Sequence, residues 1–142
     1  MSGDPANAFR RLATMFLLPM LAHPDAPHQL TNVDRGTVLA TDVQPAFDSA
    51  SRNRGLLGRA SLPEGSAIVI APSSSIHMFF MRFPIDAVFV ARDGRVVKTC
   101  TGLRPWRIAV AWRAFAVIEG PVGMIARSAT EAGDRLAVGL RP

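Results

Sequence analysis

The sequence predicts a mainly β fold, built as a single-domain β-sandwich or a partly open barrel with one or two short helices. About eight short apolar stretches recur along the chain, and Gly, Pro, Asn and Asp turn signals separate them. A length of 142 residues fits one domain. A hydrophobic content of 49% is that of a globular protein and excludes a disordered chain.

Residues 1–34 differ from the rest and are expected to form an N-terminal extension before a β domain over residues 35–142. Arg10 and Arg11 precede an apolar run at 12–22. Read as a helix, one face would carry Phe9, Leu12, Ala13, Phe16, Leu17, Met20 and Leu21. The run resembles part of an export signal, but no Ala-x-Ala cleavage site follows it. Residues 23–34 are Pro-rich and polar, which predicts a linker.

Three interpretations of this extension stay open: an amphipathic or disordered segment, a degenerate export signal, and a misassigned start codon. The apolar run is too short to span a membrane as a helix, so membrane contact is expected only through this extension. A cytoplasmic and a periplasmic location are both compatible with the sequence. Deleting residues 1–32 is expected to leave the melting temperature within a few degrees.

The β domain is justified element by element. Asp48 is a plausible N-cap for a short helix over 49–57, and Asp93-Gly94 predicts a hairpin. A turn at 120–123 leads into a helical turn at 124–127. The predicted strands are 37–43, 67–71, 76–81, 87–91, 95–101, 108–112, 115–119 and 135–138.

Four ordered motifs resemble those of the domain of unknown function 192 family, a bacterial and archaeal family. They are 54–59 (RGLLGR), 76–86 (IHMFFMRFPID), 117–123 (VIEGPVG) and Gly133-Asp134. The resemblance covers about residues 37–138 and implies a compact fold with jelly-roll-like sheets. It implies no catalytic residues. Many members look exported, which suggests the cell envelope, but this chain lacks a clean signal peptide. The motif residues expected to matter structurally are Gly55, Leu56, Gly58, Met81, Phe83, Pro84, Asp86, Gly123, Gly133 and Asp134.

The stretch 77–86 places Arg82 and Asp86 in an apolar run. Burying an ionised group costs several kcal/mol unless it is paired or hydrogen-bonded. We therefore expect both side chains to be at least half buried and hydrogen-bonded. Asp86 is expected to accept from backbone N–H groups or from Arg59, and Arg82 to pair with Glu119 or a carbonyl.

Asp86, Glu119 and His77 are the candidate catalytic residues. Two carboxylates and a histidine would suffice for metal-assisted hydrolysis. A purely structural role for Asp86 is the alternative, because no second carboxylate lies near it in sequence. The chain contains no closely spaced histidine pair, so neither a metal nor another cofactor is expected.

Trp106 lies between Arg104 and Arg107, just after a proline. A tryptophan in such a setting can stack a sugar or an extended partner, or it can cover an open end of the sheets. Arg82 and Arg59 complete the candidate ligand-binding set. Removing the Trp106 side chain is expected to weaken ligand binding at little cost in stability.

The net charge of +5 comes almost entirely from arginines, which are scattered rather than clustered among aromatic residues. A nucleic-acid partner is therefore not expected. Cys100 is the only cysteine, which excludes an intramolecular disulfide and indicates a buried small side chain.

We expect a binding or accessory module for a small ligand, a saccharide or a protein segment. A hydrolase using Asp86, Glu119 and His77 is the alternative, and a purely structural accessory domain is the third. Of these functions, a non-enzymatic one is favoured. Convergence of these side chains in an open pocket would favour the enzyme.

Overall fold

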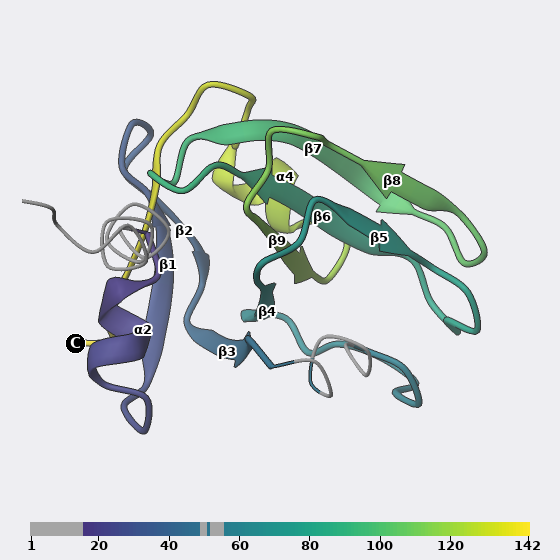
Figure 1. The fold of residues 1–142 in the computed structure, drawn as a ribbon, viewed down its shortest axis with the longest axis horizontal. Helices are drawn as coiled ribbons and strands as arrows, with labels where there is room; N and C mark the ends of the chain where they lie inside the picture. Colours follow the sequence, from purple (N-terminus) through teal and green to yellow (C-terminus); the bar gives the residue numbers. More distant parts are fainter. Residues whose placement is uncertain (1–15, 49–50, 52–55) are drawn as a thin grey trace, which may run out of the picture.

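The computed structural model describes residues 16–48, 51 and 56–142. Within these residues the chain forms ten strands and two short helices (Figure 1). In chain order they are α2 (Leu18–Ala22), β1 (His28–Asn32), β2 (Thr37–Ala40), β3 (Asp42–Ala46), β4 (Ser66–Ile70), β5 (Ser75–His77), β6 (Ile85–Val90), β7 (Val96–Leu103), β8 (Ile108–Val110), β9 (Ala116–Gly120), α4 (Met124–Ser128) and β10 (Leu136–Leu140).

The five-stranded sheet has the order β3-β4-β9-β6-β7, and only the β3–β4 pair is parallel. Strands β4, β6 and β9 are buried along their whole length. Their runs of Val, Ile and Ala suit strands covered on both faces. Pro45 is tolerated in β3 because β3 is an edge strand.

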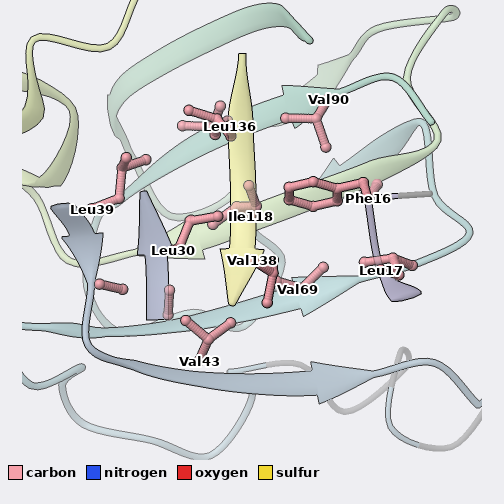
Figure 2. Packing of buried hydrophobic residues seen from close by; sticks show 14 of the residues in the cluster. Phe16, Leu17, Leu30, Leu39, Val43, Val69, Val90, Ile118, Leu136 and Val138 are labelled. Atoms are coloured by element: carbon pink, nitrogen blue, oxygen red, sulfur yellow. The ribbon is translucent and has the colours of Figure 1, made fainter. Parts of the chain in front are cut away.

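One face of this sheet packs against the antiparallel sheet β10-β1-β2. Figure 2 shows Leu30, Leu39, Leu136 and Val138 of the small sheet meeting the inward side chains of β4, β6 and β9. The other face is covered by a second apolar cluster that includes Ile76 and Ala109 of the two-stranded ribbon β5–β8. The described strands form open sheets and no closed barrel, and the prediction of a mainly β fold with one or two short helices is confirmed.

The segment predicted to be a linker contains a strand instead. β1 pairs with β10 along His28–Asn32 and with β2 on its other side. Its burial alternates along the strand, and Leu30 is fully buried. The alternation of His28, Leu30 and Asn32 with polar residues is too weak a hydrophobic signal to reveal a strand from sequence.

The N-terminal segment also contributes to the core. Phe16, Leu17 and Met20 are each at most 4% exposed and belong to the cluster between the two sheets (Figure 2). The Phe16 N–H donates to the Arg92 carbonyl at 3.1 Å. The prediction that residues 1–32 are dispensable therefore conflicts with the packing, because their loss would remove β1 and part of the core.

The strand predicted at 76–81 ends early, at His77. From Met78 the backbone turns, because Phe80 adopts a left-handed conformation with φ 64°. Met78 and Met81 are buried while Phe80 and Arg82 are exposed, which is not the alternation of a strand. The predicted helix over 49–57 lies largely outside the described residues; Asp48 does accept from the Ser51 N–H at 2.7 Å, as an N-cap would.

Candidate functional site

Asp86 is fully buried, and its carboxylate accepts three backbone hydrogen bonds. Oδ1 accepts from the Gly102 N–H at 2.9 Å, and Oδ2 accepts from Gly123 at 3.1 Å and Ile125 at 3.0 Å. These bonds join β6 to β7 and to the start of α4. The expectation of a buried, hydrogen-bonded Asp86 is confirmed, and its partners are backbone N–H groups rather than Arg59.

Arg82 contradicts the expectation of burial. Its side chain is exposed, and it forms no ion pair with any residue in the described ranges. The turn at 79–84 explains this, because the left-handed Phe80 and the following Pro84 direct residues 80, 82 and 84 outward. The cost of burying its charge is thus avoided rather than offset.

Glu119 is 6% exposed, and burial raises the pKa of its carboxyl group to about 7. Its register neighbours are Ile68 on β4 and Ala87 on β6. Neither Arg59 nor Arg82 reaches it: Arg59 Nη2 instead donates to Gln44 Oε1 at 3.4 Å. No ionic partner for Glu119 occurs in the described part of the chain.

The three catalytic candidates do not converge. Asp86 and Ala87 are consecutive in β6 and point to opposite faces of the sheet, and Glu119 shares the face of its register partner Ala87. His77 is exposed on β5, outside the large sheet. The Asp86 oxygens accept from three backbone N–H groups, an arrangement that ties β6 to β7 and to α4.

A different group of side chains forms a surface cluster, which we call the aromatic patch: His77, Phe79, Phe80 and Trp106. The His77 and Phe79 rings stack with centroids 4.9 Å apart. Trp106 lies 5.9 Å from Phe79 and 4.9 Å from Phe80. Phe80 is 73% exposed and Trp106 59%. The patch lies at the end of the ribbon β5–β8 where His77 pairs with Ile108. The ribbon itself lies on the side of the molecule away from α2 and β1 (Figure 1).

Two left-handed residues shape the aromatic patch. Phe80 has φ 64° and Trp106 has φ 69°, a conformation that costs about 1–2 kcal/mol for a residue with a Cβ. Short hydrogen bonds fix the backbone there: the Trp106 N–H donates to the Met78 carbonyl and the Met78 N–H to the Arg107 carbonyl, each at 2.7 Å. Sequence reasoning selects Trp106 but misses Phe80, because a strand pattern conceals the turn.

Three arginines lie in the chain segments that form the aromatic patch. Arg82, Arg104 and Arg107 are exposed and lie in the two segments, 77–84 and 104–108, that build the patch. These segments contain no acidic residue. The predicted ligand-binding residues Trp106, Arg104, Arg107 and Arg82 therefore belong to one part of the chain's surface, whereas Arg59 is bonded to the edge strand β3.

The remaining motif residues have structural positions. Leu56, Met81 and Phe83 pack in the second cluster, and Gly58, Gly123 and Gly133 have positive φ. Asp134 accepts from Asn32 and from the Glu131 N–H, and these bonds lower the pKa of its carboxyl group. Gly55 lies outside the described residues.

Three further features could indicate a site: the single cysteine, a metal-binding cluster and a membrane-spanning helix. Cys100 is partly buried rather than fully buried as predicted, and its burial raises the pKa of the thiol. Among the described residues, no cluster of His, Cys, Asp or Glu could hold a metal ion. No helix in that part of the chain is long and apolar enough to cross a membrane.

Comparisons with known proteins return uncharacterised relatives. The family model DUF192, described as "Uncharacterized ACR", matches residues 30–138. A UPF0127 protein of Pyrococcus furiosus is 35% identical over 113 residues, covering 75% of this chain and 95% of that protein. Another, from Pyrococcus horikoshii, is 43% identical over 101 residues, with coverage of 67% and 85%.

Two solved structures have a similar fold. A protein of unknown function from Novosphingobium aromaticivorans superposes with a TM-score of 0.66 at 25% identity, covering 78% of this chain and 82% of its own. A protein from Sinorhizobium meliloti gives a TM-score of 0.68 at 22% identity, covering 80% and 92%.

Proposed function

The chain belongs to the domain of unknown function 192 family, and we propose that it is a binding module whose aromatic patch holds a segment of a partner protein. The segment would carry apolar side chains next to acidic ones. The observation that carries this proposal is the exposure of Phe80 and Trp106 on a backbone held in an unfavourable conformation.

The side chains of the patch are those that dominate protein–protein interfaces. Trp and Arg are enriched among the interface residues whose truncation to alanine weakens binding most, and Phe is enriched at interface cores. Ile108, which is 60% exposed, pairs with His77 across the ribbon and extends the apolar surface of the patch along β8. Exposed aromatic and aliphatic side chains gathered in one place, with arginines in the same segments, are typical of a surface that binds a partner.

Backbone strain supports a binding role. A left-handed Phe80 or Trp106 is more costly than glycine or asparagine at the same position. Side chains retained at such a cost, and left exposed, contribute little to folding. Strained residues that are held by their surroundings are concentrated at ligand-binding sites.

The positive charge near the patch favours an acidic partner segment. The two segments that build the patch carry three exposed arginines, Arg82, Arg104 and Arg107, and no acidic residue. Arginine binds carboxylates through two parallel hydrogen bonds, which favours an acidic segment over a basic one. The tilted arrangement of Trp106 against both phenylalanines, at 36° and 57°, suits several side chains better than one flat ring.

Peptide selection tests this proposal. A displayed library of random peptides of about 12 residues is selected on the wild-type protein and counter-selected on the Phe80→Ala, Trp106→Ala double variant. We expect recovered peptides to combine acidic with aromatic or aliphatic residues. The affinity of one such peptide is then measured by the fluorescence of Trp106 in the Trp112→Phe variant, where it is the only tryptophan.

Exchanging the acidic residues of that peptide for lysine should weaken binding at least about tenfold. Failure to recover peptides that require Phe80 and Trp106 would contradict the proposal. An acidic oligosaccharide, tested as trigalacturonate, should not bind at this site; if it binds and the peptides do not, the ligand is a saccharide instead.

A further inference from the structure

A second surface lies at the other end of β8, and it is independent of the aromatic patch. Trp106 precedes β8 and Trp112 follows it. We propose that the surface beside Trp112, which we call the arginine groove, binds a small ligand that joins a flat ring to a phosphate group, the class of a nucleoside monophosphate.

The arginine groove consists of two adjoining hollows. One, of about 620 Å³, is lined by residues 91–93 and 112–115. The second, of about 530 Å³, is lined by 95–97, 132–133 and the three residues that both hollows share, Ala91, Asp93 and Arg113. Hollows of this volume hold ligands of a few tens of atoms. Arg113 lies at the junction, within reach of a ligand in either one.

The charge of the groove is positive. Arg92, Arg95 and Arg113 line it against one acidic side chain, Asp93. Asp93 is already engaged, since its Oδ2 lies 3.6 Å from Arg135 and its Oδ1 accepts from the Arg95 N–H. Arg113 forms no ion pair with another described residue. A phosphate bound beside Arg113 would supply the missing counter-charge through bidentate hydrogen bonds.

Two rings flank these charges. Trp112 is 88% exposed, so nearly its whole ring is available for stacking. Phe115 is partly buried, and the Arg92 guanidinium lies 5.1 Å from its centroid. The contact with Phe115 holds Arg92 in place on the wall of the groove. A flat ring stacked on Trp112 would therefore place an attached phosphate near cations that are already positioned.

The wall of the groove is rigid. The hairpin 91–95 is closed by hydrogen bonds between Ala91 and Arg95 and between Gly94 and Ala91, and the Leu136 N–H donates to the Gly94 carbonyl at 2.8 Å. Gly94 has φ 88°, and a Cβ there would collide with the Leu136 carbonyl, so only glycine permits this docking. Such preorganisation lowers the entropy lost on binding.

Isothermal titration calorimetry with the full chain tests the proposal. The ligands are AMP, adenosine and inorganic phosphate, so that ring and phosphate are separated. We expect AMP to bind at least about tenfold more tightly than either part. Arg113→Ala and Trp112→Ala should each weaken AMP binding by a similar factor, without a change in melting temperature, because both side chains are exposed. Arg127→Ala, which removes an arginine paired with Glu64, is the charge-matched control and should not change it.

Three results would overturn the proposal: no AMP binding, AMP binding no tighter than that of phosphate, or equal losses in Arg127→Ala and Arg113→Ala. A single-stranded deoxyadenosine octamer distinguishes the source of the phosphate. If the octamer, per nucleotide, displaces AMP at lower concentration, the groove binds a polymer and the small-ligand proposal fails.

Discussion

At the scale of single residues, three charged side chains of the central motifs have three different environments. Asp86 is buried and fully hydrogen-bonded, Glu119 is buried without an ionic partner among the described residues, and Arg82 is exposed. Sequence alone predicts that Asp86 must be compensated. It does not predict whether the Arg82 side chain is buried or exposed, because that depends on the left-handed turn at Phe80.

Replacing Asp86 should destabilise the protein strongly. Asp86→Asn places an amide donor against backbone N–H groups that now donate to a carboxylate, so we expect a loss of about 3 kcal/mol in the free energy of unfolding. Chemical denaturation measures it. The matched control is Asp42→Asn, at an exposed position, which should change stability by less than about 0.5 kcal/mol. An Asp86→Asn protein as stable as the wild type would return this residue to the list of catalytic candidates.

Glu119 should make stability depend on pH. Its pKa is near 4.5 when exposed and about 7 in the folded protein, so the folded state binds the proton more tightly. Below pH 4.5 the Glu119 carboxyl is protonated in both the folded and the unfolded state, so it does not lower the free energy of unfolding. Stability is lost as pH rises through 7, by about 3 kcal/mol. Glu119→Gln should remove this loss and be the more stable protein at pH 8.

Denaturation of wild type and Glu119→Gln at a series of pH values checks the prediction. The difference between the two proteins should grow between pH 4.5 and 7 and then stay constant. A difference that does not vary with pH would show that Glu119 is solvated in the folded state.

Phe80 should contribute to binding and not to stability. At φ 64°, asparagine is better tolerated than phenylalanine, and the exposed ring contributes little to the core. Phe80→Asn should therefore keep or raise the free energy of unfolding, by up to about 1 kcal/mol, while it weakens binding of a peptide selected on the wild type. Denaturation and a peptide titration on the same variant measure both. A stability loss above about 1 kcal/mol would assign Phe80 to the fold.

At the scale of elements, the strands with continuous apolar residues are the predictable part. The predicted strands 67–71, 87–91 and 115–119 correspond within a few residues to β4, β6 and β9, which are buried on both faces. The Asp93-Gly94 hairpin and the helical turn at 124 are likewise observed. β1 is missed because its apolar content is small, although it pairs both with the neighbouring β2 and with the distant β10.

The N-terminal segment should contribute measurably to stability. Met20 is 3% exposed in the core, whereas the next residue in α2, Leu21, is 46% exposed. Met20→Ala should lower the free energy of unfolding by about 2–4 kcal/mol, and Leu21→Ala should change it little. Thermal and chemical denaturation of the two variants measure the contrast. Equal, small effects would mean that α2 does not pack on the domain in solution.

At the scale of the whole molecule, the two surfaces proposed to bind lie at opposite ends of β8, while the Asp86 carboxylate ties β6 to β7 and α4. The fold class follows from sequence because alternating short strands leave few other arrangements. The site follows only in part. Trp106 and its arginines stand out beside a proline, but the meeting of segments 77–80 and 104–108 is a tertiary contact that no local pattern encodes.

The affinity of one selected acidic peptide for matched tryptophan variants tests the central claim most directly. The claim is that the aromatic patch, and not the buried carboxylates, performs the function of the chain. Calorimetry should show at least about a tenfold loss of affinity in Trp106→Ala and none in Trp112→Ala, with the melting temperature of both close to that of the wild type. Unchanged affinity in Trp106→Ala, or an equal loss in the two variants, would contradict the account.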